Sequence, residues 1–374
     1  MMLARSLTHR TWLAATGALL FAMGCGANAT PATSRDGATD ARVADAANTD
    51  ATSPDDSGPS LEDVFFPPSD ASTDGESASD ASADGASTRR GPPYPVVFHH
   101  GFAGFRDIGP INYYFNVARD LRARGERVYE AEVTPFDSPA SRALQLSRYV
   151  DRVLEESNSQ KVILIAHSQG GLDSRHMISS LGYGDRVAAL VTISTPHRGT
   201  RVADTVLGFV PGATQSFINA IATLFAWTYN EARERMDINA ALLGLSEREA
   251  TAFNRANPND PRVRYWSYAG RSHLRTGVAV CGGARYENEP LRVDSTTLPL
   301  APFAALLEGL DPVNNVNDGL VTVESARWGE FQGCIPADHM DEVGQIAHTG
   351  PIASGFDHIA FYRKIVSDLR AAGY

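Results

Sequence analysis

Apolar positions along residues 94–374 fall into two kinds of block, short runs and longer segments with helical spacing. The short runs have the length of buried strands and occur at 94–101, 127–133, 162–166, 187–195 and 263–270. Helices are predicted at about 112–124, from Asp137 or Ser138 onward, and at about 356–371. Strands that alternate with amphipathic helices predict right-handed βαβ units, and so an α/β fold with a mostly parallel central sheet flanked by helices.

The stretch VILIAHSQGG, at 162–171, places a serine in a turn between a buried strand and a helix. Its A-x-S-x-G spacing is typical of the nucleophile elbow, in which small residues on either side of the serine allow a cramped backbone. Ser168 is therefore a candidate nucleophile, and the backbone N–H of Gln169 is a candidate donor to an oxyanion. Because S-x-G also occurs in ordinary turns, the assignment depends on a base and an acid elsewhere in the chain.

The gap between the runs at 187–195 and 263–270 is too long for a simple crossover connection. It contains a helical stripe of apolar residues at 217–225. An insertion of about 200–260 at this point of a parallel sheet would lie over the carboxyl ends of the strands, where substrates bind. We interpret it as a helical lid, and ordinary core packing is the alternative.

The first 90 residues differ in composition from the rest of the chain. Arg5 and Arg10 precede an apolar segment at 12–23 that is too short to span a bilayer, which predicts a signal peptide over 1–25 and export of the protein. Its end resembles a bacterial lipoprotein signal, in which Cys25 would be lipidated, although Ala22 and Met23 depart from the usual pattern. Ordinary signal cleavage, giving a secreted protein, is the alternative to an outer-membrane anchor.

Residues 26–90 consist mainly of Ala, Ser, Thr, Asp, Gly and Pro, and such a segment buries too little apolar surface to fold. We predict a disordered tether that leads to one catalytic domain at 91–374. The net charge of the whole chain, −11, is carried by the tether, because 89–374 holds 29 basic and 31 acidic residues. No basic stripe is present, so nucleic-acid binding has no support.

Two cysteines, Cys281 and Cys334, remain after signal processing. An even pair in an exported protein suggests a disulfide. Closing that loop would contribute about 4 kcal/mol in the chain-entropy model.

A nucleophile on this kind of sheet is followed along the chain first by the acid and then by the histidine. The C-terminal third offers NDGLV at 317–321 and DHMDEVGQ at 338–345. His348 and His358 also follow, and a structural role is expected for His358 because it falls at the start of the terminal helix. His167 is interpreted as a neighbour of the elbow rather than as a participant.

Five motifs together resemble those of the bacterial true lipases typified by Pseudomonas and Burkholderia enzymes, which belong to the α/β-hydrolase superfamily. They are HHGFAGF (99–105), AHSQGG (166–171), STPHRGT (194–200), NDGLV (317–321) and HMDEVGQ (339–345). Each is weak alone, whereas the set is specific and extends from about residue 94 to the C-terminus. The resemblance implies an α/β-hydrolase fold, with Asp318 as the acid of the catalytic triad and His339 as its general base.

The same resemblance implies further site residues. The second oxyanion donor would be the backbone N–H of Phe102, since His100-Gly101 brings the first turn close to the elbow. A structural Ca²⁺ would be held by four residues: Asp294, Asp341, and the backbone carbonyls of Gln345 and Thr349. Two carboxylates with carbonyls suit a hard cation. The two cysteines do not match the usual disulfide of this family.

Our first functional hypothesis is an exported carboxylic ester hydrolase, a triacylglycerol lipase that forms an acyl-enzyme at Ser168. Its partners would be acylglycerols or other lipid esters at a lipid–water interface, and a dedicated folding chaperone is a further candidate because some relatives need one. A short-chain carboxylesterase or a polyester depolymerase is the alternative within the same chemistry. A non-catalytic binding module tethered to the cell surface is the alternative from another class.

Overall fold

The computed structural model describes residues 89–108, 111–210, 237–273, 281, 294–309, 311, 315–345 and 356–374. The predicted signal peptide, nearly all of the predicted tether and the apolar stripe at 217–225 lie outside the described residues. Among the residues that are described, no helix has both the length and the apolar character needed to cross a membrane.

A six-stranded sheet forms the centre of the domain, with the strand order β10-β7-β6-β5-β1-β4. Every pairing within it is parallel. Its strands are β1 (Val96–His99), β4 (Val128–Ala131), β5 (Val162–His167), β6 (Val187–Ile193), β7 (Arg264–Gly270) and β10 (Glu330–Ile335). The predicted parallel sheet and five of these strands are confirmed, whereas β10 was not predicted.

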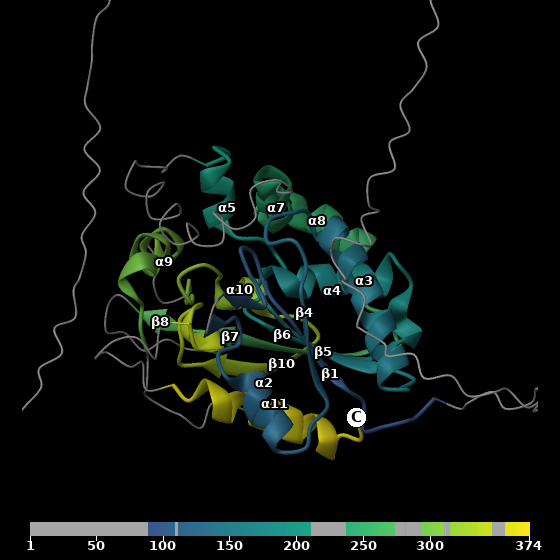
Figure 1. The fold of residues 1–374 in the computed structure, drawn as a ribbon. Coiled ribbons are helices and arrows are strands. Elements are labelled where there is room, and N and C mark those ends of the chain that lie inside the picture. The colour runs from purple at the N-terminus through teal and green to yellow at the C-terminus, as the bar shows by residue number, and fades with distance from the viewer. Residues whose placement is uncertain are drawn as a thin grey trace, which may run out of the picture. The chain divides into compact units, whose positions relative to one another are not determined.

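Helices cover both faces of this sheet (Figure 1). On one face lie α3 (Pro139–Glu156) and α4 (Gln169–Ser179), and on the other lie α2 (Val117–Ala123) and α11 (His358–Ala371). Each residue of β5 is buried, which fits a central strand covered on both faces and explains why its sequence is a continuous apolar run.

Helix α3 begins where the sequence predicts. Pro139 occupies its first turn, and the Ser138 side chain accepts a hydrogen bond from the Ser141 backbone N–H at 3.2 Å. On the buried face of α3, one side chain is charged, since Arg142 lies beside Ala143 and Leu146 without exposure to solvent.

The predicted start of α2, at about residue 112, is wrong. The helix begins at Val117, because Asn116 has a φ of 60° that breaks the helical path. Just before it, β3 (Ile111–Asn112) pairs antiparallel with β2 (Asp107–Ile108). Tyr114 is turned into the core, where its hydroxyl donates to the His99 carbonyl at 2.7 Å. This tertiary contact outweighs the local helical spacing.

The insertion between β6 and β7 is helical in its described parts. It holds α5 (Arg201–Val206), α7 (Ile238–Leu245) and α8 (Glu247–Ala256), which lie together above the sheet in Figure 1. Ala203 of α5 and Leu245 of α7 pack with Leu172 at the start of α4. These helices therefore lie next to the turn that carries Ser168, while a lid function for them stays a prediction.

The connection after β7 is fastened to β10 by the predicted disulfide. Cys281 and Cys334 are bonded, with their Cα atoms 5.9 Å apart. The same connection contains α9 (Ala301–Glu308) and two short strands, β8 (Ser272–His273) and β9 (Asp294–Ser295), that pair with each other.

Candidate active site

Ser168 lies in the turn between β5 and α4 with φ 55° and ψ −131°. A non-glycine residue rarely adopts positive φ, and such strain concentrates at functional sites. The Ser168 backbone N–H donates to the Ile193 carbonyl of β6 at 2.9 Å, which ties the turn to the neighbouring strand. The elbow geometry predicted from the A-x-S-x-G spacing is therefore present.

The two glycines after the serine are required by close packing of α4. A Cβ atom on Gly170 would lie 2.7 Å from the His100 carbonyl oxygen, and one on Gly171 would lie 2.1 Å from the Thr195 hydroxyl. Larger residues would push the first turn of α4 away from β1 and β6. The start of α4 is thus held beside the serine, and its first N–H groups have no partner within the helix.

The predicted acid and base form a buried pair. His339 Nδ1 lies 2.8 Å from Asp318 Oδ2, and the His339 backbone N–H donates to the Asp318 carbonyl at 2.9 Å. The other carboxylate oxygen of Asp318 accepts from the backbone N–H groups of Leu320 and Val321 at 2.8 and 2.7 Å. Asp318 is thus fixed on both sides, with one oxygen directed at the imidazole.

The pKa of Asp318 reflects these contacts. Burial acts to raise it, but the charge and hydrogen bond of His339, together with the two backbone donors, bring the pKa below its usual value. Asp318 is therefore a carboxylate at neutral pH, which selects the His339 tautomer with hydrogen on Nδ1. That tautomer leaves Nε2 as the proton acceptor.

His339 lies over the elbow. Its ring packs on the ring of His167, the residue before the nucleophile, with 4.5 Å between the centroids. Ser168 is 8% exposed and His339 is 4% exposed. The structure thus brings the three predicted triad residues to the carboxyl ends of the central strands. Ser168 follows β5, Asp318 lies in the turn at 317–321 and His339 lies in the loop after β10.

The turn after β1 touches the elbow, as predicted for the oxyanion donor Phe102. A Cβ atom on Gly101 would lie 2.6 Å from the Ser168 Cβ, so only glycine allows this approach. The Phe102 ring packs edge-on against Phe136 at 5.0 Å, and the Ala103 backbone N–H donates to the Pro135 carbonyl at 2.9 Å. The turn that carries Phe102 therefore lies against Ser168, and Gln169 directly follows Ser168 in the chain.

A buried ion-pair cluster holds this turn, and sequence reasoning missed it. Arg142 donates to the His100 carbonyl at 2.7 Å and to Asp173 at 2.7 Å, while His99 lies 2.9 Å from the same carboxylate. None of the side chains of Arg142, His99 and Asp173 is exposed. The signal available in the sequence was a charged residue on the apolar face of α3.

A second buried carboxyl group, Glu342, was also missed. It lies in a short turn, Asp341–Val343, and its Oε2 is 2.9 Å from His167 Nε2. Burial, followed by the negative charge of Asp318, raises the pKa of Glu342 well above its usual range. Atoms of His167, His339 and Glu342 that could bind a cation lie within 4.8 Å of one another.

The predicted calcium ligands are described only in part. Asp341 is 3% exposed and lies two residues after His339, in the loop that follows β10, called here the histidine loop. The Gln345 side chain donates to the carbonyls of Asn112 and Tyr113, which leaves its backbone carbonyl for the predicted role. Asp294 is described in its backbone only, where it pairs with Ser272, and Thr349 lies outside the described residues.

Of the rival histidines, His358 lies at the start of α11, where its Nε2 is 2.9 Å from the Phe115 carbonyl, a structural contact. His348 lies outside the described residues.

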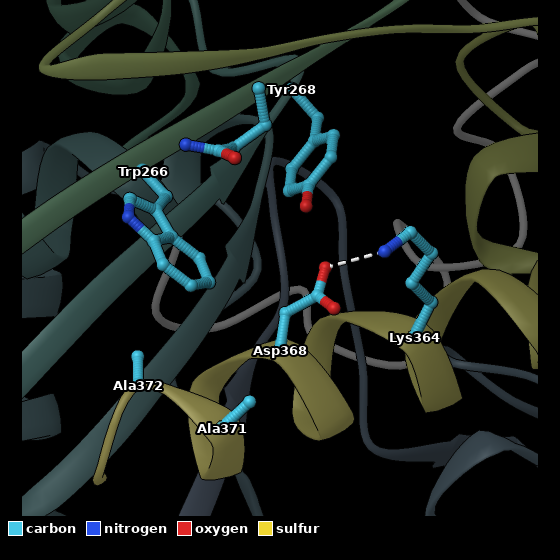
Figure 2. Close-up of a pocket in the computed structure, with 7 residues that line it drawn as sticks. Trp266, Tyr268, Lys364, Asp368, Ala371 and Ala372 are labelled. Carbon is cyan, nitrogen blue, oxygen red and sulfur yellow. Dashed lines mark hydrogen bonds and ion pairs between the residues drawn. The ribbon is translucent and has the colours of Figure 1, made fainter. Parts of the chain in front are cut away.

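A cavity of about 390 Å³ lies between β7 and α11, lined by Trp266, Tyr268 and the ion pair of Lys364 with Asp368 (Figure 2). Its lining contains no predicted site residue.

Comparison with known proteins agrees with this geometry. The family model described as alpha/beta hydrolase fold matches residues 94–228, which include β1, the elbow and β6. The chain has the α/β-hydrolase fold. The predicted fold class is thereby confirmed.

Within that fold the chain is similar to bacterial lipases, as its motifs predicted. It is 29% identical over 335 residues to a triacylglycerol lipase of Burkholderia plantarii, covering 79% of this chain and 91% of the relative. It is 29% identical over 327 residues to one of Pseudarthrobacter phenanthrenivorans, covering 77% of this chain and 100% of the relative. The Staphylococcus hyicus lipase structure matches with a TM-score of 0.55 and 19% identity, over 77% of this chain and 98% of that one.

The contact between Gly101 and Ser168 generates a prediction for ester hydrolysis by this chain. We expect Gly101→Ala to lower kcat for an ester by about 10²-fold. The added Cβ would force the turn after β1 that carries Phe102, called here the oxyanion turn, away from the nucleophile. Gly91→Ala is the control, since a Cβ there meets no atom within 4 Å. Steady-state kinetics on both variants would check this, and equal kcat values would contradict it.

Proposed function

We propose that the protein is an exported triacylglycerol lipase that acts through Ser168, Asp318 and His339. The observation that carries the proposal is the buried pair of Asp318 and His339, which meets the strained serine turn at one edge of the sheet. The similarity of the chain to bacterial proteins named triacylglycerol lipase supports the choice of substrate. An ester hydrolase follows from the site, and the acylglycerol preference follows from the relatives.

The chemistry follows from the position of each group. Ser168 Oγ attacks the ester carbonyl while His339 Nε2 takes its proton, and the Asp318 carboxylate stabilises the imidazolium that forms. The backbone N–H groups of Phe102 and Gln169 stabilise the oxyanion. His339 then gives its proton to the leaving alkoxide. Water, activated by the same histidine, releases the fatty acid from Ser168 and regenerates the hydroxyl.

Apolar side chains near the inserted helices suit a lipid–water interface. Phe209 follows α5, Leu243 lies on α7 and Leu298 precedes α9, and these three are 41%, 38% and 86% exposed. A dedicated folding chaperone remains part of the proposal on the basis of the family resemblance alone.

Substitution of the triad tests the proposed reaction. We expect Ser168→Ala and His339→Ala each to lower the kcat of ester hydrolysis by about 10³-fold or more. His358→Ala should remain active, because its contact with the Phe115 carbonyl is structural. Near-normal activity of His339→Ala, together with loss in His358→Ala, would overturn the assignment of the base.

A labelling experiment decides the substrate class. Labelling by alkyl phosphonate esters of increasing chain length, read by mass spectrometry of the Ser168 peptide, should become faster with chain length for a lipase. A decreasing rate would favour the short-chain esterase. Absence of any labelling and of any hydrolysis would leave the non-catalytic binding module.

For export, we propose that the mature chain begins at a lipidated Cys25 and that the acidic tether separates the enzyme from the membrane. The intact mass of the native protein should then include a diacylglyceryl group, and Cys25→Ser should release the protein into the medium. A native N-terminus without lipid would instead support a secreted enzyme.

For the metal, we propose a structural Ca²⁺ beside the histidine loop. The donor set fits, since Asp341 offers a carboxylate and Gln345 a backbone carbonyl, both of which are oxygen ligands. The segment that carries Asp294 lies against the same loop, because the Thr297 backbone N–H donates to Asp338 Oδ2 at 2.8 Å. When bound, the ion would neutralise the two aspartates and hold the loop of His339 in place.

Chelation checks this proposal. Removing the ion leaves like charges close together, so we expect a lower melting temperature and lower activity, both restored better by calcium than by magnesium. Asp341→Asn should have a low melting temperature that calcium no longer raises, whereas the exposed Asp185→Asn should keep the full calcium response. An unchanged melting temperature in the metal-free protein would refute the site.

A further inference from the structure

An uninterrupted chain of hydrogen bonds runs beneath the candidate triad, from the oxyanion turn to the histidine loop. The Gly101 backbone N–H donates to Tyr113 Oη at 3.2 Å, and Tyr113 Oη lies 2.7 Å from His167 Nδ1. His167 Nε2 in turn lies 2.9 Å from Glu342 Oε2. Tyr113, His167 and Glu342 come from segments far apart in the sequence.

The direction of this chain is determined by its first member. A backbone N–H only donates, so the Tyr113 oxygen accepts from Gly101 and its single hydrogen is directed to His167 Nδ1. A neutral imidazole that accepts at Nδ1 carries its hydrogen on Nε2, which then donates to Glu342. Burial, and then the nearby His339, lowers the pKa of His167 well below its usual value, in agreement with a neutral ring.

A second branch reaches Glu342 from the opposite side. The Gly270 backbone N–H donates to Ser194 Oγ at 2.9 Å, so the hydroxyl hydrogen of Ser194 is directed to Glu342 Oε1, 2.6 Å away. Ser194 has a φ of 45°, which brings its side chain into this position. Glu342 therefore contacts Ser194 at one oxygen and His167 at the other, and the contact with His167 persists whichever of Glu342 Oε2 and His167 Nε2 carries the shared hydrogen.

These contacts place His167 between the two halves of the site. One ring nitrogen is linked through Tyr113 to the turn that carries Phe102, and the other is linked through Glu342 to the loop that carries His339. One face of the same ring packs on the His339 imidazole. Displacement of His167 would therefore move the oxyanion donor and the general base relative to each other.

We propose that His167 is a positioning residue, which keeps the oxyanion turn in register with the catalytic histidine through its hydrogen bonds to Tyr113 and Glu342. Because the role is one of alignment, it affects the chemical step rather than substrate binding. The proposal rests on the proposed function, since it assumes that Ser168 and His339 perform ester hydrolysis.

Tyr113→Phe tests the hydrogen bond between Tyr113 and His167. The variant keeps the ring and deletes only the hydroxyl, and we expect kcat on a short soluble ester to fall about ten-fold while KM stays within about two-fold. Tyr183→Phe is a matched control, because Tyr183 also makes one 2.7 Å hydrogen bond, to Asp151, remote from the site. The two variants should lose similar stability in urea, while the control keeps full kcat.

A double-mutant cycle tests the link through His167. His167→Phe keeps an aromatic ring against His339 but breaks both hydrogen bonds, so kcat should fall by about 10–100-fold. In that background Tyr113→Phe should cause no further loss, whereas independent effects would multiply. If His167→Phe does not fold, His167→Leu serves, because it also lacks both ring nitrogens.

Two outcomes overturn the proposal: a Tyr113→Phe variant with the kcat of Tyr183→Phe, or losses that multiply in the double variant. Its failure is distinct from failure of the proposed function. Hydrolysis that survives Ser168→Ala refutes the proposed function. Hydrolysis that requires Ser168 but ignores the Tyr113 hydroxyl refutes only the role of His167.

Discussion

Polar side chains at the carboxyl ends of the central strands are buried, and the need to satisfy each of them organises the site. His99 ends β1, His167 ends β5 and Ser194 follows β6, and none is more than 1% exposed. An unpaired polar group in such a place costs about 1–3 kcal/mol, so each requires a partner supplied by another segment. Asp173 and Glu342 are those partners, and they draw α4 and the histidine loop onto the strand ends.

The same constraint explains how the chain tolerates its strained serine. A non-glycine residue at positive φ costs about 1–3 kcal/mol, and the surrounding structure must hold it there. The hydrogen bond from Ser168 to β6 supports one side of the turn, and contact with Gly101 limits the other. Because Arg142 anchors that second turn from α3, the strain at the nucleophile is supported by elements on both sides.

Much of the fold was predictable from the sequence, because a fully buried strand leaves a continuous apolar run, as at 162–166. The elbow was predictable because its motif is local, whereas the pair of Asp318 with His339 was predicted from the resemblance of two further motifs to those of bacterial lipases. The start of α2 was not predictable, since Tyr114 is positioned by a contact with β1. The contacts of Arg142, His167 and Glu342 were not predicted for the same reason: their partners Asp173, Glu342 and His167 lie 31 to 175 residues away in the sequence. Strand β10 was not predicted because its sequence, EFQGCI, contains Glu330, Gln332 and Gly333 and so is not a continuous apolar run.

The position of β10 also explains why His339 is held by several tertiary contacts. Among the described residues, β10 lies at the edge of the sheet and pairs with β7 only, and its pairing is irregular between Phe331 and Gly333. Edge strands hold their position less firmly than central ones, yet His339 follows this one within a few residues. The disulfide at Cys334 fixes the strand itself. Beyond its end, the loop depends on the backbone and side-chain bonds to Asp318 and on Glu342, so the alignment of the base is set by tertiary contacts rather than by the sheet.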